Sequence, residues 1–415
     1  MESKLDLNRD IPELDWAPHL AARTEGMKSS IIRELLKLTQ QPDVISLAGG
    51  MPAPEFFPLR EIEEACRHVI REDGANALQY SATEGYGPLR EYLADAMHKY
   101  GVPVAPGNVL MTNGSQQALD LIGRTFLDPG DYVLTSRPTY LGALQSWNAY
   151  QARYHTVPLD DDGMVVDEIE HAYKKVLADS GRPPRFIYVL PNFHNPGGTT
   201  LPLERRQRLA EIATKLNLPI VEDDPYGELR YEGEDIPPIC TFIPERTIYT
   251  STFSKTLAPG LRLGWIVCRE PLMHRFVQAK QGADLHTGTF AQYIAGDICQ
   301  RGLLKPHVKQ LCQVYKERRD TMLDALVEFW PQGCSWTHPQ GGLFLWARLP
   351  EPIDTTEFLK EAIAEKVAYV PGIYFYPNQD GGRDAMRLTF SFCPPDVIVE
   401  GIRRLGTALK RKLGN

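Results

Sequence analysis

Short apolar runs bounded by turn residues alternate with longer amphipathic segments between about residues 60 and 300, and this alternation constrains the fold more than any other feature of the chain. We interpret the apolar runs as strands, at 109–111, 132–135, 186–190, 219–222, 247–251 and 264–268. The segments between them, such as 116–126 and 203–216, carry apolar residues at helical spacing. Strands that alternate with helices form mostly parallel sheets covered by helices. The sequence therefore predicts an α/β fold with a mostly parallel central sheet.

The chain changes character outside this region. Near its start we expect a helix at about 29–39, followed by a turn-rich loop at 46–52. After residue 300, long helices rich in Lys, Arg and Leu precede apolar runs at 341–346, 369–370 and 386–392. We therefore expect three parts, which are an N-terminal segment at 1–59, a large domain at 60–300 and a smaller α+β domain at 301–415.

Composition and charge exclude several classes of protein. Hydrophobic residues make up 43% of the 415 residues and charged residues 24%, without low-complexity tracts, which argues against a fibrous or disordered chain. The net charge of −8 and the lack of a basic block argue against nucleic-acid binding. No apolar run approaches the roughly 20 residues that cross a bilayer, and no signal peptide is recognisable. We therefore expect no nucleic-acid or membrane partner.

The seven cysteines are scattered along the chain and form no CxxC motif. This pattern favours free thiols in a reducing compartment over a disulfide framework or a zinc site. We therefore expect a cytoplasmic protein without a bound metal.

The segment 250–264 (TSTFSKTLAPGLRLG) places Lys255 directly after a predicted strand, among hydroxyl and glycine residues. In a desolvated site a lysine amine loses its proton readily enough to attack a carbonyl and form a Schiff base. Arg262, Thr252 and Ser254 would offer a phosphate group one cation and two hydroxyl donors. A Ser-Lys pair alone is more often typical of a solvated loop, so the other segments decide its interpretation.

Acidic residues close the predicted strand at 219–222, with Asp223 and Asp224 followed by Tyr226. Ligands collect at such strand ends in open α/β sheets. A carboxylate there can pair with a pyridinium nitrogen, and a tyrosine can bond the hydroxyl of the same ring. A solvated turn is the alternative for this segment.

The strand predicted at 186–190 leads into the turn Asn195-Pro196-Gly197-Gly198. Asn195 could bond the phenolic oxygen of a cofactor, and its peptide to Pro196 is a candidate for the cis form. Such turns are common, and a structural turn is the alternative. We interpret His194 as a satisfied or exposed imidazole rather than a catalyst.

Two further segments offer an anion site and an aromatic ring. At 109–119 a strand, a glycine turn and a helix follow one another, and Ser115 is the predicted N-cap, so the first amides of the helix would be free to bind an anion. Tyr140 could stack on a flat cofactor. The alternatives are an ordinary strand-to-helix turn and a core or surface tyrosine.

The run 386–391 alternates apolar and polar residues with a period of two, which puts Arg387 on one face of a strand together with Thr389 and Ser391. An arginine presented in this way can bind a carboxylate through two parallel hydrogen bonds. A surface salt bridge is the alternative.

In chain order these segments read Gly-Ser-Gln, Tyr, Asn-Pro-Gly, Asp-x-x-Tyr, Ser-Lys, Arg and a strand arginine. This ordered set resembles the fold-type-I, class I/II aminotransferases, which depend on pyridoxal phosphate. Within that family the segments 46–52, 78–87 and 278–287 are most similar to the group of 2-aminoadipate, kynurenine II and aromatic aminotransferases. The resemblance covers the chain from about residue 25 onward.

The resemblance implies a role for individual residues around the cofactor ring. Lys255 would carry pyridoxal phosphate as a Schiff base, and Asp223 would pair with the pyridine nitrogen. The ring would also be contacted by Tyr226, Asn195 and Tyr140, the last of which would stack on it. With Lys255 and Asp223, Tyr226 is an expected catalytic residue.

The resemblance also implies roles at the phosphate and the substrate. The phosphate would be bound by Ser115, Gln116, Thr252, Ser254 and Arg262. The substrate α-carboxylate would be bound by Arg387, Asn195 and the backbone of Gly50. Tyr80 would reach the phosphate of the neighbouring subunit, so each site of a homodimer would need both chains.

Two departures from the family pattern leave the required groups in place. The usual Asn-Pro-Thr-Gly turn reads Asn195-Pro196-Gly197-Gly198, which we expect to loosen the turn. The usual Ser-x-Ser before the lysine reads Thr252-Phe253-Ser254, which keeps both hydroxyls.

The implied reaction is a ping-pong amino transfer in which Lys255 moves the Cα proton of the substrate to C4′ of the cofactor. A decarboxylase or lyase on the same scaffold is the first alternative, and a retained carboxylate on Arg387 favours transamination over it. A regulator that joins this fold to a DNA-binding domain is the second, and the helix expected near 29–39 leaves little room for that domain. No GxGxxG or GxxxxGK[ST] motif occurs, which argues against dinucleotide and P-loop enzymes.

The expected substrates depend on Arg33, which lies in the first predicted helix. In the resembling group this helix lines the pocket for the substrate side chain, so the segment 1–59 would contribute to both the small domain and the substrate pocket. Arg33 could pair with the distal carboxylate of 2-aminoadipate or glutamate and swing away from aromatic or aliphatic side chains. A surface ion pair is the alternative. We expect 2-oxoglutarate as amino acceptor and aromatic, 2-aminoadipate or leucine-like donors.

Overall fold

The computed structural model of the chain describes residues 14–27 and 43–414. The helix expected at about 29–39, and Arg33 with it, lie outside the described residues.

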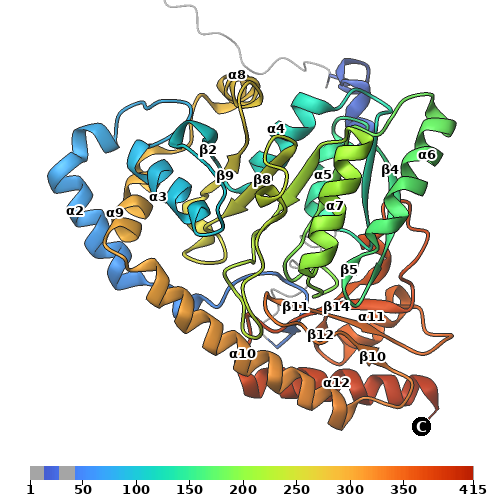
Figure 1. The fold of residues 1–415 in the computed structure, drawn as a ribbon. Coiled ribbons are helices and arrows are strands. Elements are labelled where there is room, and N and C mark those ends of the chain that lie inside the picture. The colour runs from blue at the N-terminus through green and yellow to red at the C-terminus, as the bar shows by residue number, and fades with distance from the viewer. Residues whose placement is uncertain (1–13, 28–42, 415) are drawn as a thin grey trace, which may run out of the picture.

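An eight-stranded sheet forms the centre of the molecule (Figure 1). From one edge to the other its strands are β2 (Val109–Thr112), β9 (Gly264–Val267), β8 (Thr247–Thr252), β7 (Ile220–Asp223), β6 (Phe186–Val189), β3 (Tyr132–Arg137), β4 (Arg153–Asp160) and β5 (Gly163–Met164). The pairs from β8 across to β4 are parallel, whereas β9 is antiparallel to both of its neighbours and β5 is antiparallel to β4. The prediction of a mostly parallel central sheet is confirmed.

All six predicted strands are present in this sheet, and their sequences explain why they were recognisable. β6 and β7 are buried along their whole length, so they read as continuous apolar runs. Two strands were missed, β4 and β5. β4 lies near the edge and carries exposed positions with polar residues, so it has no apolar run.

Helices cover both faces of the sheet. Along β6, Ile187 and Val189 pack into one apolar cluster and Tyr188 into the other. The first cluster contains residues of α6 (Ile169–Ser180) and α7 (Leu203–Leu216), and the second contains residues of α4 (Ser115–Phe126), α5 (Leu141–Asn148) and α8 (Leu272–Asp284). The sheet therefore lies between two helical layers, as the alternation in the sequence predicts.

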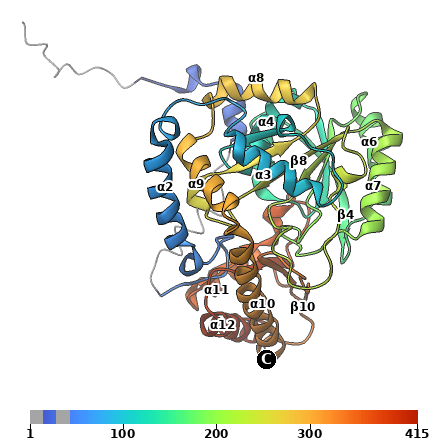
Figure 2. The ribbon, with the colours of Figure 1, turned by 60° about the vertical axis from the view of Figure 1, so that its left-hand side comes forward.

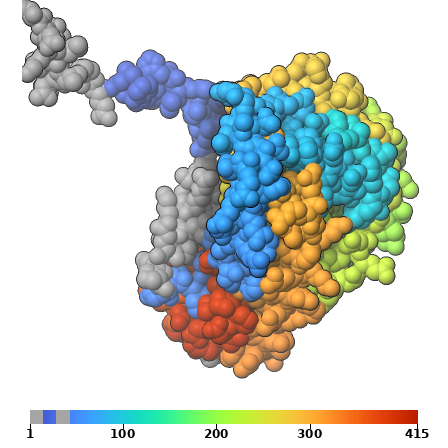
Figure 3. All heavy atoms as spheres, turned by 90° about the vertical axis from the view of Figure 1, so that its left-hand side faces the viewer, coloured from blue at the N-terminus to red at the C-terminus, as the bar shows by residue number. Residues whose placement is uncertain are grey.

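The remaining helices of the first 300 residues form the left-hand side of Figure 1. They are α2 (Leu59–Ala77), α3 (Gly87–His98) and α9 (Thr289–Gln300). Helix α9 packs against both of the others, and Figure 3 shows α2 and α9 side by side on this face of the molecule.

The C-terminal part builds a second, smaller sheet below the first (Figure 2). Its order is β10 (Ser335–Trp336), β11 (Phe344–Arg348), β14 (Ala385–Thr389) and β13 (Val370–Pro371), with antiparallel pairs throughout. The helices of this part are α10 (Leu304–Phe329), α11 (Thr355–Ala364) and α12 (Pro395–Leu413). Near the start of the chain, β1 (Ile45–Ser46) pairs in parallel with β12 (Val367–Ala368), so an N-terminal strand lies with the C-terminal elements.

Within the part of the chain that the structure describes, no helix combines the length and the apolar character needed to cross a membrane.

Candidate active site

A cavity of about 260 Å³ lies where the parallel strands of the large sheet end. The strands β3, β6, β7 and β8 run in the same direction, so the residues that follow them meet at one edge of the sheet. The cavity is lined by Gly50, Ser115, Gln116, Tyr140, Leu190, Asn195, Asp223, Pro225, Tyr226, Thr252, Ser254, Lys255, Pro259, Arg262, Phe344 and Arg387. All of the expected site residues that the structure describes are therefore gathered here except Tyr80.

Lys255 reaches into the cavity from the turn that follows β8. Its Nζ donates a hydrogen bond of 2.7 Å to the carbonyl oxygen of Gly50, which comes from the N-terminal segment. Burial lowers the pKa of the Lys255 amine to about 8, and the positive charges of Arg387 and Arg262 act in the same direction. A sizeable fraction of this amine is therefore neutral near physiological pH and able to act as a nucleophile.

Asp223 ends β7 inside the cavity, and one of its carboxylate oxygens is free. The Tyr188 hydroxyl donates a hydrogen bond of 2.8 Å to Oδ2, whereas buried Oδ1 has no partner among the described residues. Burial raises the pKa of the Asp223 carboxyl to about 7, against the lowering effect of the Tyr188 hydrogen bond. Leaving a buried polar atom unpaired costs about 1–3 kcal/mol, so Oδ1 is suited to a donor brought by a ligand.

The neighbouring Asp224 differs from Asp223 in every respect that matters for ligand binding. Its Oδ1 accepts from Asn192 and its Oδ2 accepts from Tyr249, at 3.0 and 3.3 Å. It does not line the cavity. The solvated turn considered from the sequence is wrong for both carboxyls, because Asp223 and Asp224 are buried.

Arg387 lies on β14 of the smaller sheet and is buried, with 1% of its surface exposed. Its Nη1 donates to Oδ1 of Asn195 at 2.9 Å and its Nη2 donates to the carbonyl oxygen of Ala48 at 2.6 Å. Its Nε has no partner among the described residues, and the guanidinium lies 4.1 Å from the ring centre of Phe344. The surface salt bridge considered from the sequence is therefore wrong.

The electrostatics of Arg387 fit an anionic ligand. Burial lowers the pKa of its guanidinium to about 10, although Tyr226 and Tyr140 act in the opposite direction. No carboxylate of the described residues forms an ion pair with it. A buried cation without a counter-ion is costly, and a carboxylate of a ligand would relieve that cost.

Two tyrosines and Asn195 complete this part of the cavity. Nδ2 of Asn195 lies 3.5 Å from the Tyr226 hydroxyl, so Asn195 links Tyr226 to Arg387. Burial raises the pKa of Tyr226 far above its usual value and that of Tyr140 to about 12, so both hydroxyls stay protonated. We call Asp223, Tyr226, Asn195 and Arg387 the inner group.

The turn that presents Asn195 is held by His194. The His194 Nδ1 accepts from the backbone N–H of Gly197 at 3.2 Å, and its Nε2 donates to the Ser136 hydroxyl at 2.9 Å. Burial lowers the pKa of His194 to about 3, so the ring is neutral, as a satisfied imidazole should be. The Asn195–Pro196 peptide is cis, and Gly198 has a φ of +71° where a Cβ would lie 2.8 Å from the Phe344 carbonyl oxygen. The turn is therefore closely packed despite its glycine pair.

The other end of the cavity is built where β8 ends and α4 begins, together with the turns beside them, and we call its members the turn group. They are Ser115, Gln116, Thr252, Ser254 and Arg262. The Thr252 hydroxyl lies 2.9 Å from the Ser254 hydroxyl and accepts from the Ser254 backbone N–H. Arg262 donates only to backbone carbonyls, those of Pro259 and Asn113, at 3.3 Å each. No carboxylate of the described residues pairs with Arg262, so its charge is available to an anion.

Helix α4 begins at this end, with one correction to the sequence prediction. The N-cap is Gly114 and not Ser115, which is the first helical residue. Gly114 has a φ of +74°, and a Cβ at this position would lie 2.5 Å from the Arg262 guanidinium, so only glycine fits there. The side chain of Gln116 bonds Gly142 and Ser146 of α5. The backbone N–H groups of Ser115 and Gln116 belong to the first turn of α4, where N–H groups have no partner within the helix.

Among the described residues, one expected site residue does not line the cavity. Tyr80 is 78% exposed, and its ring makes an edge contact with His286 at 5.8 Å between ring centres. Arg33 lies outside the described residues. Sequence reasoning in turn missed Tyr188, Phe344 and the Ala48 carbonyl. The signal that points to Tyr188 is its alternation with Ile187 and Val189 on a predicted strand, although the pairing of that strand with the one that ends in Asp223 was not predicted.

The family model described as aminotransferase class I and II matches residues 42–405. The chain belongs to this aminotransferase family. The aminotransferase is 46% identical to an aromatic-amino-acid aminotransferase of Thermococcus litoralis, over 100% of this chain and 99% of that protein. It is also similar to the crystal structure of a multiple substrate aminotransferase from Thermococcus profundus, with a TM-score of 0.92 and 44% identity over 97% of this chain and 100% of that one.

A third similar protein is an alpha-aminoadipate aminotransferase from Thermus thermophilus, solved in complex with N-(5'-phosphopyridoxyl)-L-leucine. The TM-score is 0.89, and the identity is 39% over 97% of this chain and 100% of that one. The predicted fold, that of the fold-type-I enzymes, is confirmed, and so is the predicted activity. The protein is an amino-acid aminotransferase that depends on pyridoxal phosphate.

The residues around the cavity fit this cofactor. A pyridinium nitrogen needs an anionic acceptor, and Oδ1 of Asp223 is buried and unpaired. A phosphate needs cations and N–H donors, and Arg262 lies beside the first amides of α4. A carbonyl group needs a neutral amine, which the lowered pKa of Lys255 provides.

Proposed function

We propose that this aminotransferase moves the amino group of an aromatic, 2-aminoadipate or leucine-like L-amino acid to 2-oxoglutarate by a ping-pong mechanism. The observation that carries the proposal is the buried Arg387 guanidinium, which lines the same cavity as Lys255 and has an unpaired Nε. Both amino acids and 2-oxo acids bring an α-carboxylate, so one arginine can serve the two halves of the reaction.

In this proposal three members of the inner group, Asp223, Tyr226 and Asn195, hold the cofactor ring, Arg387 holds the substrate carboxylate, and the turn group holds the phosphate. Asp223 would pair with the pyridine nitrogen, and Tyr226 and Asn195 would bond the ring oxygen. Tyr140 would lie against the ring. When bound, pyridoxal phosphate supplies an electron sink for the bond that is broken at the substrate Cα.

Lys255 acts as the nucleophile and as the base of the proposed mechanism. Its neutral amine would hold the cofactor through the carbonyl carbon, with loss of water, and a substrate amine would take its place. The released amine would then accept the proton from the substrate Cα and deliver it to C4′. The Gly50 carbonyl oxygen, 2.7 Å from Nζ, would orient the amine.

Arg387 and Asn195 determine which bond breaks. A carboxylate bound to Arg387 is held rather than lost, and the substrate amine would then have a fixed direction relative to Lys255. This arrangement favours proton transfer over the decarboxylase and lyase alternatives. The backbone of Gly50, whose carbonyl oxygen accepts a hydrogen bond from Lys255, would form the wall of the carboxylate site that comes from the N-terminal segment.

The proposed donors follow the similar proteins, whose names refer to aromatic amino acids, to several substrates and to alpha-aminoadipate. Arg33 would recognise dicarboxylates. Arg33→Ala should therefore lose far more efficiency with 2-aminoadipate than with phenylalanine, measured as kcat/KM for each donor. An equal loss for both donors would remove Arg33 from substrate recognition.

A homodimer with shared active sites is part of the proposal. Tyr80 follows α2, which carries exposed apolar side chains, among them Leu59 and Ile70, and Leu78 after it is 70% exposed. Exposed apolar side chains are typical of a contact between subunits, and α2 lies on the face drawn in Figure 3. Tyr80 would reach the phosphate in the site of the second chain.

The proposal also includes the domain boundaries and the cellular compartment that we expect from the sequence. Residues 60–300 would be the cofactor-binding domain, and 301–415 would form the small domain together with the segment 1–59. All seven cysteines are free thiols, which supports a cytoplasmic location.

Product analysis tests the proposed reaction. The purified enzyme with 2-oxoglutarate and phenylalanine, 2-aminoadipate or leucine should form glutamate and the matching 2-oxo acid in equal amounts. Initial rates at several fixed acceptor concentrations should give parallel double-reciprocal lines, because the two substrates never meet on the enzyme. Release of carbon dioxide or free ammonia without glutamate would support the decarboxylase or lyase instead.

A further inference from the structure

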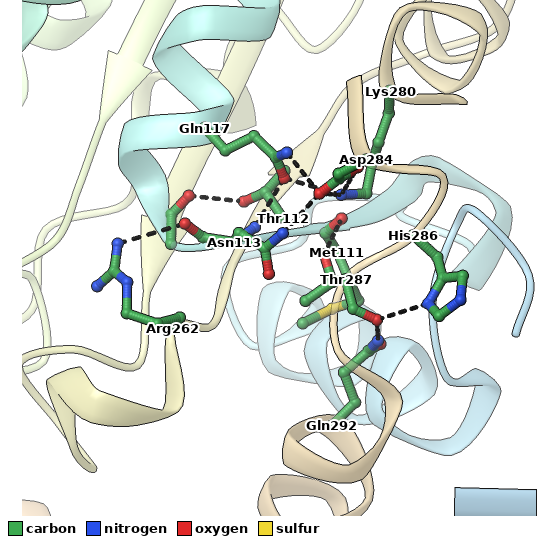
Figure 4. A network of polar contacts seen from close by, with 11 residues as sticks. Met111, Thr112, Asn113, Gln117, Arg262, Lys280, Asp284, His286, Thr287 and Gln292 are labelled. Atoms are coloured by element: carbon green, nitrogen blue, oxygen red, sulfur yellow. Dashed lines mark hydrogen bonds and ion pairs between the residues drawn. The ribbon is translucent and has the colours of Figure 1, made fainter. Parts of the chain in front are cut away.

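A buried ion pair lies behind the turn group, at the end of α8 (Figure 4). Nζ of Lys280 is 3.0 Å from both carboxylate oxygens of Asp284, one helical turn away. The Lys280 side chain is fully buried and that of Asp284 is 22% exposed. Both belong to the segment 278–287, one of the segments that resemble the aminotransferase group and the only one without a role in the proposed reaction.

The ion pair is bonded to the turn between β2 and α4. Oδ2 of Asp284 accepts from Nδ2 of Asn113 at 2.5 Å and from Nε2 of Gln117 at 2.6 Å. Oε1 of Gln117 accepts in turn from Lys280 at 2.8 Å and from the Asn113 backbone N–H at 2.8 Å. These bonds close a ring, in which each of the four residues contacts at least two others.

The same turn leads directly to the turn group. Asn113 precedes Gly114 and Ser115, and its carbonyl oxygen accepts from Arg262 at 3.3 Å. The Thr112 hydroxyl donates to the Gly114 carbonyl oxygen at 3.0 Å. Asn113 is therefore bonded to the ion pair through its side chain and to Arg262 through its backbone.

Stability alone does not account for such a pair. Desolvation offsets much of the attraction between buried charges, and apolar residues in their place are often neutral or stabilising. Burial lowers the pKa of Lys280, against the opposing effect of Asp284, which is the sign of a desolvated amine. The pair orients its neighbours, because its donors and acceptors fix the orientation of the Asn113 amide.

We propose that Lys280 and Asp284 are positioning residues, which hold the turn at Asn113 so that the first amides of α4 and Arg262 are aligned for the cofactor phosphate. The inference rests on the proposed function, in which the turn group binds that phosphate. An aligned site spends less free energy on ordering when the ligand binds. The pair should therefore affect affinity for the phosphate and leave the contacts of the ring unchanged.

Two ligands separate these effects, namely pyridoxal phosphate and pyridoxal, which lacks the phosphate. The apoenzyme of each variant is titrated with both, and the dissociation constants are read from the near-visible absorbance of the bound form. Asp284→Asn should raise the dissociation constant of pyridoxal phosphate about tenfold, because it removes a charged acceptor from three donors. The dissociation constant of pyridoxal should change by less than about twofold. Asn113→Ala keeps the ion pair. It should raise the dissociation constant of pyridoxal phosphate about threefold and leave that of pyridoxal unchanged.

Asp320→Asn on α10 is the matched control. Asp320 pairs with Lys316 at 2.8 Å and at the same helical spacing, and it also accepts from Arg319, but it has no contact with the turn. It should change neither dissociation constant. If Asp284→Asn fails to fold, Asn113→Ala decides the question.

Three outcomes would overturn the inference. The first is an equal loss of affinity for the two ligands in Asp284→Asn and Asn113→Ala, which would mean a general structural role. The second is no loss for either ligand, while Arg262→Ala still weakens pyridoxal phosphate selectively. The third is an Arg262→Ala enzyme that loses no phosphate-specific affinity, which would overturn the phosphate site itself and the inference with it.

Discussion

The inner group and the turn group lie in one cavity but are built in opposite ways. The inner group comes from strand ends and buried positions, and it keeps polar atoms unpaired, such as Oδ1 of Asp223 and Nε of Arg387. In the turn group the hydroxyls of Thr252 and Ser254 bond each other, and Arg262 bonds the backbone. The inner group thus offers unpaired side-chain atoms to a ligand, whereas the positions of the polar groups in the turn group are set by the local backbone. Changes in the inner group should therefore affect turnover, and changes in the turn group should affect cofactor affinity.

Lys255, which lies between the two groups, should give the largest effect. Lys255→Ala should reduce turnover by more than about 10³-fold, because nucleophile and base are lost together. The variant should still fold and hold pyridoxal phosphate noncovalently, since both groups remain. Borohydride reduction of the wild-type enzyme followed by peptide mapping should label Lys255, and a label on another lysine would contradict the assignment.

The next largest effect distinguishes two adjacent carboxyls. Asp223→Ala should lower kcat/KM by about 10²–10³-fold, because the charge opposite the ring nitrogen is lost. Asp224→Ala should cost much less, because Asn192 and Tyr249 occupy its oxygens. Steady-state kinetics of the two variants with one donor measure the difference. A larger loss in Asp224→Ala would reverse the proposed roles.

A smaller effect should come from the residue that holds Asp223. Tyr188→Phe removes the hydroxyl that donates to Oδ2 and should lower kcat about tenfold, since hydrogen bonds to charged groups contribute about 1.5–3 kcal/mol. Tyr249→Phe is the matched control, because its hydroxyl donates to Asp224 at 3.3 Å. Similar losses in the two variants would mean that the bond to Asp223 has no special role, and no loss in Tyr188→Phe would mean that Tyr188 acts only through packing.

The smallest effect is a shift along the pH axis. The rate at which the apoenzyme binds pyridoxal phosphate covalently should rise as pH increases through about 8, because the Lys255 amine must lose its proton before it attacks. Arg387 lowers the pKa of Lys255, so Arg387→Met should raise that pKa and move the midpoint to higher pH. Arg262→Met should move it in the same direction but less. A midpoint that moves to lower pH in either variant would contradict the electrostatic account.

The large sheet was predictable because its central strands are buried on both faces, and their apolar runs stand out in the sequence. The site residues on those strands followed, since parallel strands deliver their ends to one edge. What could not be predicted depends on segments that meet only in space. The Ala48 carbonyl and Arg387 are 339 positions apart, and the N-cap at Gly114 depends on the place that Arg262 takes beside it. The contacts of the Gln116 side chain with Gly142 and Ser146 of α5 could not be predicted either, because they join two helices that meet only in the folded chain.

The pairing of β1 with β12 bears on how the enzyme is made. A ribosome releases Ile45 and Ser46 early, but their partners Val367 and Ala368 emerge only when the chain is almost complete. Contacts between such distant positions form late, because closing a long loop costs entropy before any contact repays it. The parallel strands can assemble from segments that are already present, whereas the hydrogen bond from Arg387 to the Ala48 carbonyl can form only after residue 387 has been synthesised. This wall of the cavity is therefore completed late in the synthesis of the chain.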